Sequence, residues 1–279
     1  MTNTLITQPH LGVGTWFLGE SPHKEKEEIA ALQYALSNGV TIVDTAEMYG
    51  NGRAETLVGK AIQPFQRDKI HLVSKVLPSN ANAKRLEASL DASLSRLKTD
   101  YLDLYLYHWR GNTPLNETID MLEQMKKKGK ILNWGVSNFD LEDMQELLEL
   151  PDGKQCATNQ VLYHLGSRGI EYALKPFQDA HQIPTMAYCP LAQAGDLNRR
   201  LLTNQDLQAL AADLKLNCYQ LLLCFTLAQK NMVSIPRSGK LEHMKQLVAC
   251  QQITLTPKQL DLLNQLFPAP RHRVALDME

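Results

Sequence analysis

Four residues of types that can act together on a carbonyl group stand at or just beyond the ends of apolar runs. Asp44 closes the run VTIVD, and Tyr49 follows five positions later. Lys75 lies near the end of IHLVSKV and His108 near the end of YLDLYLYHW. A tyrosine of unperturbed pKa, about 10, is a poor proton donor near neutrality, but a nearby ammonium lowers that pKa. We therefore predict a relay in which Asp44 holds Lys75 and Lys75 lowers the pKa of Tyr49, which acts as the general acid.

The fourth residue completes the chemistry. A neutral histidine at position 108 would orient a substrate carbonyl and donate a hydrogen bond to the developing alkoxide. The set includes no activated serine or cysteine, and the sequence has no HExxH or similar metal-ligand spacing. We therefore predict hydride addition to a carbonyl, with a nicotinamide cofactor as the hydride source and no metal. Each residue alone also has an ordinary structural explanation, and the prediction depends on their combination.

The composition excludes several other classes of function. The chain has 279 residues, of which 44% are hydrophobic, and Lys plus Arg (29) nearly balance Asp plus Glu (30). This balance does not indicate a nucleic-acid partner. We find neither a signal peptide nor an apolar run long enough to cross a bilayer, so we expect a cytoplasmic protein without membrane contact. The five cysteines include no CxxC pair, which argues against a disulfide framework or a zinc site.

The elements that must position these residues are short β-rich runs that alternate with helical patterns. Helices are expected over 83–97, over 113–128 with Thr113 as its cap, and over 141–149 with Asp140 as its cap. An enlarged loop is expected after the seventh run, within 191–216. The runs lie at 12–16, 40–45, 70–76, 101–109, 132–138, 156–163, 184–190 and 232–238.

This alternation predicts the α/β class and a single (β/α)8 TIM barrel, with one domain over residues 1–279. A doubly wound dinucleotide-binding sheet is the rival fold, but its GxGxxG fingerprint is absent, because LGVGTWF places Phe17 where the third glycine belongs. In a barrel, catalytic residues gather where the strands end. The further polar residues at or near predicted strand ends are Ser137, Asn138, Gln160, Tyr188, Arg237 and Ser238.

Taken in order, these motifs resemble the aldo-keto reductases over essentially the whole chain. The resemblance is carried by LGVGTW, DTAEMYGNG, VSKV, LYLYHW, GVSNF, NQVLYH, AYCPLAQAG and SIPRS. The stretch NQVLYHLGSRGIEY and the closing ALDM are most similar to bacterial cytoplasmic members that reduce methylglyoxal and other small aldehydes. The resemblance implies a (β/α)8 barrel whose catalytic tetrad is Asp44, Tyr49, Lys75 and His108.

The resemblance also implies how NADPH is held. Ser137, Asn138 and Gln160 would bind the nicotinamide carboxamide, and Tyr188 would stack on the ring. The loop PLAQAGDL, which begins with Pro190 and Leu191, would cover the pyrophosphate. Arg237 and Ser238 would bind the 2′-phosphate, for which a planar guanidinium is well suited. The family places aromatic residues as substrate-pocket walls at the positions of Trp16 and Trp109.

At the last strand the sequence departs from the family pattern. His243 stands where the family has an arginine, and Gln246 and Leu247 replace Glu-Asn. A histidine is mostly neutral at pH 7, so we expect NADPH to be preferred by a reduced margin, with NADH as a weaker substitute.

We expect a monomer that acts on a small carbonyl substrate. A barrel of the same family serving as a nucleotide-binding regulatory or structural protein with little turnover is the alternative, and a metal-dependent hydrolase or lyase is a second rival. The segments 109–113 and 268–279 are short, which suggests an open pocket.

Overall fold

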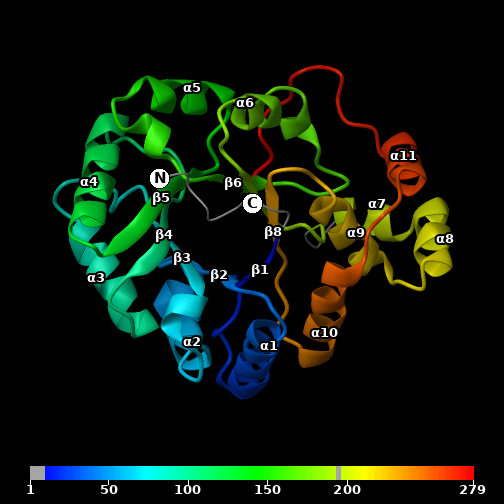
Figure 1. Cartoon of the computed structure of the whole chain (residues 1–279), viewed down its shortest axis with the longest axis horizontal. Coiled ribbons are helices and arrows are strands. Elements are labelled where there is room, and N and C mark those ends of the chain that lie inside the picture. The colour runs from blue at the N-terminus through cyan, green and yellow to red at the C-terminus, as the bar shows by residue number, and fades with distance from the viewer. Residues whose placement is uncertain (1–9, 193–195) are drawn as a thin grey trace.

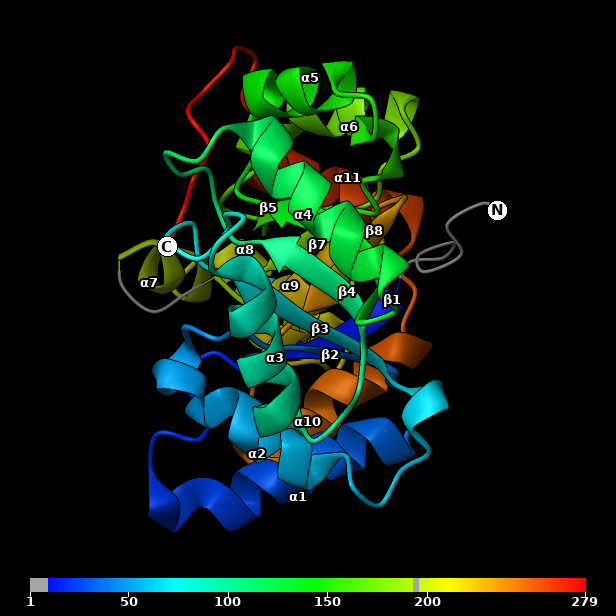
Figure 2. The same ribbon diagram turned by 90° about the vertical axis from the view of Figure 1, so that its left-hand side faces the viewer.

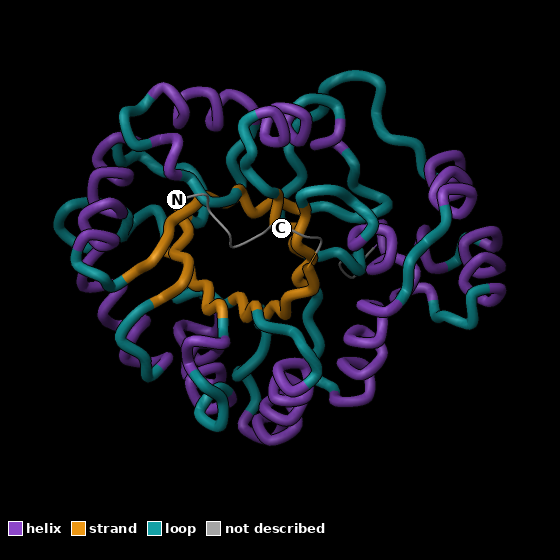
Figure 3. Tube along the Cα trace, in the orientation of Figure 1, coloured by secondary structure: helices purple, strands orange, loops and turns teal. Residues whose placement is uncertain are grey.

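The strands form a closed parallel barrel surrounded by helices (Figures 1 and 3). The computed structural model describes residues 10–192 and 196–279, and within them eight strands pair in sequence order, with β8 closing on β1. The predicted (β/α)8 fold is therefore confirmed. The strands are β1 (His10–Gly14), β2 (Ile42–Asp44), β3 (His71–Val76), β4 (Leu102–Tyr107), β5 (Ile131–Ser137), β6 (Asn159–Leu162), β7 (Thr185–Tyr188) and β8 (Met232–Ile235).

Several strands end earlier than the apolar runs indicated, and for three of them the cause is local. After β5 and β7 the chain turns through Asn138 (φ 57°) and Cys189 (φ 53°), whose left-handed backbone cannot continue a strand. After β8 comes Pro236, which has no N–H to donate to a neighbouring strand. These breaks direct the residues that follow each strand toward the mouth of the barrel.

Helices cover the outside of the barrel, and Figure 2 shows them from the side. Asp140 caps α5 in a reciprocal capping box with Asp143, as predicted. The predicted cap of α4 is wrong: Pro114, in an extended conformation, is the N-cap, so the helix begins one residue after it. The helices are α1 (Glu25–Ser37), α2 (Arg53–Ala61), α3 (Leu86–Leu97), α4 (Leu115–Lys127), α5 (Leu141–Glu149), α6 (Leu174–Ala180), α7 (Asp196–Leu202), α8 (Gln205–Asp213), α9 (Cys218–Leu227), α10 (Leu241–Ala249) and α11 (Pro257–Leu266).

Two apolar clusters hold the barrel together. The larger one lies between the strands and the helices, where Trp134, Tyr105 and Phe139 are fully buried. The smaller one takes its members from alternate positions of the strands, among them Val73, Leu104 and Leu106. Because side chains alternate across a strand, Lys75 faces the same side as Val73, which is the barrel interior.

Two segments extend beyond the regular alternation. The enlarged segment after β7 contains α7 and α8. After α11 the chain runs without helix or strand over residues 267–279 and returns across the barrel (red in Figure 1). Within the described residues no single helix is long and apolar enough to span a membrane, and α8 with α9 satisfies that test only as a pair bent by 82°.

Candidate active site

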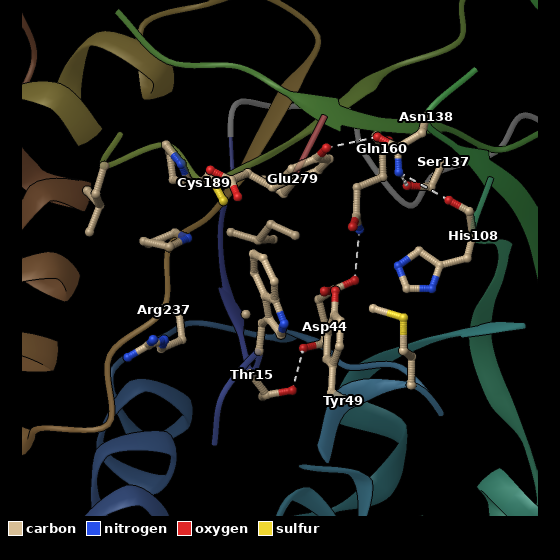
Figure 4. Close-up of a pocket in the computed structure, with 18 of the residues that line it drawn as sticks. Thr15, Asp44, Tyr49, His108, Ser137, Asn138, Gln160, Cys189, Arg237 and Glu279 are labelled. Atoms are coloured by element: carbon tan, nitrogen blue, oxygen red, sulfur yellow. Dashed lines mark hydrogen bonds between the residues drawn. The ribbon is translucent and has the colours of Figure 1, made fainter. Parts of the chain in front are cut away.

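Most of the predicted polar residues line a cavity at the end of the barrel where the strands finish (Figure 4). Asp44 is the last residue of β2, and Tyr49 begins the short 3-10 turn η3 (Tyr49–Gly52) that follows it. Lys75 lies near the end of β3, and His108 directly follows β4. Of these four residues, Asp44, Tyr49 and His108 line the cavity.

Lys75 is the centre of the buried polar cluster. Its fully buried ammonium donates hydrogen bonds to the carboxylate of Asp44 at 2.7 Å and to the carbonyl of Thr45 at 2.9 Å. It donates a third to the hydroxyl of Tyr49 at 3.0 Å, so all three of its protons are used. The other carboxylate oxygen of Asp44 accepts a bond from the amide of Gln160 at 2.8 Å. The contact expected between Asp44, Lys75 and Tyr49 is thus present.

Burial governs the pKa values of this cluster. It raises the pKa of the Asp44 carboxyl and lowers that of the Lys75 ammonium, while their mutual attraction opposes both shifts. Burial also raises the pKa of Tyr49 well above 10, and the negative charge of Asp44 raises it further. The predicted lowering of the Tyr49 pKa is therefore wrong for this structure, because the loss of solvent contact outweighs the adjacent ammonium. Tyr49 consequently holds its proton at physiological pH.

His108 faces the hydroxyl end of this cluster. Its ring meets the ring of Tyr49 edge-on at a centroid distance of 5.9 Å. Burial and, after it, the charge of Lys75 hold the pKa of His108 well below 6.5, so the ring is neutral at pH 7, as predicted. Its Nδ1 is buried without a hydrogen-bond partner. A neutral ring of this kind has hydrogen-bonding capacity left for a ligand in the cavity.

The residues expected to hold a nicotinamide form a connected group next to His108 and Asp44 (Figure 4). Ser137 donates a hydrogen bond to the carbonyl of Gln160 at 2.8 Å. Asn138 accepts one from the hydroxyl of Tyr188 at 2.9 Å and donates another to the carbonyl of His108 at 3.2 Å. All four of the residues at positions 137, 138, 160 and 188 line the cavity, and Tyr188 is only partly buried.

The residues expected to bind phosphates divide into two groups. Pro190, Leu191 and the exposed Arg237 line the cavity, and the Arg237 guanidinium lies 5.6 Å from the ring centroid of Phe17. The structure does not bring Ser238 and His243 into this cavity. Ser238 is buried, with its hydroxyl bonded to the backbone of Lys240, and His243 is exposed on α10. Residues 193–195 of the predicted pyrophosphate loop lie outside the described residues.

Aromatic side chains form the remaining wall. Trp16 follows β1 and stacks on Phe17 at 4.6 Å and on Tyr49 at 6.2 Å. Trp109 packs against His108 at 4.6 Å. Both tryptophans line the cavity and are partly exposed, as expected for the walls of a pocket that admits a small molecule.

Sequence reasoning missed two contributions to the site. Thr15 donates a hydrogen bond to the carbonyl of Asp44 at 3.0 Å and so fixes the end of β2. Glu279 also lines the cavity, close to Cys189 and Arg237 (Figure 4). The tail that carries it is held by Arg273, which pairs with Glu142. The segment 268–279 therefore closes part of a pocket that was predicted to be open, and no periodicity or motif in the tail signals this.

Among the described residues, no three His, Cys, Asp or Glu side chains are grouped so that they could hold a metal ion. Cys189, the one cysteine in the cavity, has its pKa raised to about 12, chiefly by burial, and is therefore a thiol at neutral pH.

The structure therefore combines a closed parallel barrel with a buried Asp–Lys–Tyr cluster beside a neutral histidine. The family model described as "Aldo/keto reductase family" matches residues 10–267. The chain belongs to the aldo/keto reductase family, which confirms the resemblance inferred from its motifs.

Two members of this family share 46% identity with this chain. One is "Methylglyoxal reductase YeaE" of Escherichia coli (strain K12), in an alignment that covers 98% of this chain and 96% of that protein. The other is an aldo/keto reductase from Klebsiella pneumoniae, solved in complex with NADP and acetate, which covers 98% of this chain and 96% of its own with a TM-score of 0.95. A more distant relative, at 29% identity over 68% of this chain and 66% of its own length, is the "NADH-specific methylglyoxal reductase" of Escherichia coli (strain K12).

Proposed function

We propose that this protein reduces small aldehydes and 2-oxoaldehydes of the methylglyoxal type to alcohols with NADPH, and that Tyr49 is the general acid. The observation that carries the proposal is the buried contact from Lys75 to both Asp44 and Tyr49 at the edge of a cavity with aromatic walls. The relatives named for methylglyoxal reduction support the substrate class.

The residues at the cavity fit a nicotinamide dinucleotide. Tyr188 offers a partly exposed ring face, and Asn138 and Gln160 offer amide groups beside it. Arg237 is exposed at the other end and is in none of the salt bridges found among residues 10–192 and 196–279. We infer that Arg237 takes the cofactor phosphate and that the ring lies at Tyr188. The NADP complex of the Klebsiella pneumoniae relative supports this choice of cofactor. When bound, NADPH supplies the hydride.

The roles of the protein residues follow from their protonation states. Neutral His108 donates a hydrogen bond to the carbonyl oxygen and orients it toward Tyr49. A developing alkoxide is a stronger base than a phenolate, so Tyr49 gives up its proton even with a raised pKa. Lys75, 3.0 Å from the hydroxyl, stabilises the phenolate that remains. Asp44 keeps Lys75 charged and in place. Trp16 and Trp109 enclose the small substrate and limit its contact with water.

The test is Tyr49→Phe, which removes one hydroxyl and keeps the ring that packs on Trp16. We expect kcat with methylglyoxal to fall by about two to four orders of magnitude, the usual contribution of a general acid. The dissociation constant of NADP+ should stay unchanged, as measured by quenching of tryptophan fluorescence. Normal turnover in this variant would remove Tyr49 from the acid role. Tight NADP+ binding without turnover in the wild type, across a panel of aldehydes, would favour the non-catalytic alternative.

A further inference from the structure

A second ion pair lies behind the catalytic cluster, between the barrel and its helices, with its carboxylate buried and its guanidinium partly exposed. Glu55 on α2 is fully buried, and its carboxylate accepts a bond from Nε of Arg96 on α3 at 2.6 Å. Arg96 also donates to the hydroxyl of Ser93 at 3.1 Å. Burying the carboxylate has a desolvation cost, which its bonds to Arg96 and Ser74 offset.

One end of the pair reaches the strand that carries Lys75. The hydroxyl of Ser74, the preceding residue, donates to Glu55 at 2.6 Å. Side chains of adjacent strand residues point to opposite faces, so Ser74 faces the helices while Lys75 faces the barrel interior. The bond between Ser74 and Glu55 thus fixes the backbone from which Lys75 projects.

The other end reaches the turn that carries Tyr49. Gly52, the last residue of η3, has φ 83°, and a Cβ placed on it would lie 2.6 Å from Nε of Arg96. The guanidinium therefore packs directly against the backbone of this turn. Arg96 in turn is held by Glu55. The same ion pair consequently contacts both segments whose side chains meet in the bond between Lys75 and Tyr49.

We propose that the Glu55–Arg96 pair positions Tyr49 and Lys75 against each other. Neither residue touches the cavity, so both are positioning residues and not catalytic ones. This inference rests on the proposed function, because it assumes that the contact between Lys75 and Tyr49 serves proton transfer.

The electrostatic surroundings fix the sign of the expected effect. The charge of Glu55 raises the pKa of Lys75, in the same direction as the larger contribution of Asp44. Neutralising Glu55 would therefore lower the pKa of Lys75, so the ammonium would lose its proton at a lower pH. The other titratable or charged groups facing the ammonium, the carboxylate or the tyrosine beside them are Asp44, Tyr49, His108, Glu47, Arg96 and Tyr105.

The experiment compares Glu55→Gln with Glu171→Gln. Glu171 is a matched control, because it also accepts bonds from an arginine, Arg168 at 2.7 and 2.8 Å, but lies in the short turn Gly169–Glu171, none of whose residues lines the cavity. The measurement is kcat for methylglyoxal with NADPH from pH 6 to 10, together with the NADP+ dissociation constant. In Glu55→Gln we expect kcat to fall by about 10- to 100-fold, the scale of a reacting group displaced by about 1 Å. The alkaline limb should move to lower pH and NADP+ binding should not change.

The control variant Glu171→Gln should keep the alkaline limb of the wild-type pH profile. A folded Glu55→Gln protein with the kcat and the alkaline limb of the wild type would overturn the inference. If that variant does not fold, Ser74→Ala takes its place, because it keeps the ion pair and cuts only its bond to β3; wild-type kcat there would also overturn the inference. The Tyr49→Phe variant distinguishes a failure of the proposed function from a failure of this inference. If Tyr49→Phe retains turnover, the proposed function itself fails, whereas an inactive Tyr49→Phe beside a normal Glu55→Gln leaves that function standing and removes only this inference.

Discussion

Replacing Lys75 by methionine tests how much of the site depends on one buried charge. The substitution keeps a similar volume but leaves the Asp44 carboxylate buried beside an apolar side chain, since the pair is 0% and 2% exposed. Breaking a buried pair from one side costs about 3–5 kcal/mol, because the remaining charge has lost its partner. We therefore expect Lys75→Met to lower the free energy of unfolding by about that amount. Turnover should be lost as well.

The assay is urea unfolding followed by circular dichroism at pH 7, with two companion variants. Lys60→Met removes the ammonium of the exposed pair with Glu25, in which both side chains are 41% exposed, and should cost less than about 1 kcal/mol. The double variant Lys75→Met/Asp44→Asn removes both buried charges and should recover most of the lost stability, though not the activity. If Lys75→Met cost no more than Lys60→Met, or if the double variant were less stable than the single one, the electrostatic reasoning would be refuted.

Two further predictions concern the tail and its surroundings. His164 is buried and has its pKa lowered to about 4, so between about pH 6.5 and 4 the unfolded chain binds a proton that the folded chain does not. The free energy of unfolding should therefore decrease as the pH is lowered across that window, by up to about 3 kcal/mol. His164→Gln should weaken this dependence of the unfolding free energy on pH, as measured by urea melts. An unchanged dependence would contradict the assignment of the effect to His164. Glu279 places an exposed carboxylate in the cavity proposed for an anionic dinucleotide. Glu279→Gln should therefore tighten NADP+ binding by about two- to fivefold in a fluorescence titration. Weaker binding would argue against that location of the cofactor.

The sequence was a good guide to which residues come together at strand ends. Asp44, Lys75 and His108 each follow a continuous apolar run, and a closed barrel brings the ends of such runs to one mouth. The strand boundaries were less predictable. The left-handed conformations of Asn138 and Cys189 end β5 and β7. Asparagine adopts this conformation more often than most residues but signals it less clearly than glycine, and cysteine gives no such signal.

What could not be predicted depends on three-dimensional surroundings. The pKa of Tyr49 moves in the opposite direction to the prediction, because its ring is almost fully buried. The extent of this burial cannot be deduced from the residues next to Tyr49 in the sequence. The pair of Glu55 and Arg96 joins residues 41 positions apart, on helices whose relative packing no motif describes. The tail that places Glu279 at the cavity has no helical or alternating pattern at all.

The hydrogen bond between Asp44 and Gln160 has a consequence for folding. It joins residues 116 positions apart, and their strands β2 and β6 are not neighbours in the barrel. The bond therefore forms only after the intervening strands and the closure between β1 and β8 have brought both sides of the barrel together. Contacts of such large sequence separation form slowly, because the loop that they close loses much entropy. A folding chain would thus complete this part of the cavity only when both strands have taken their places in the barrel.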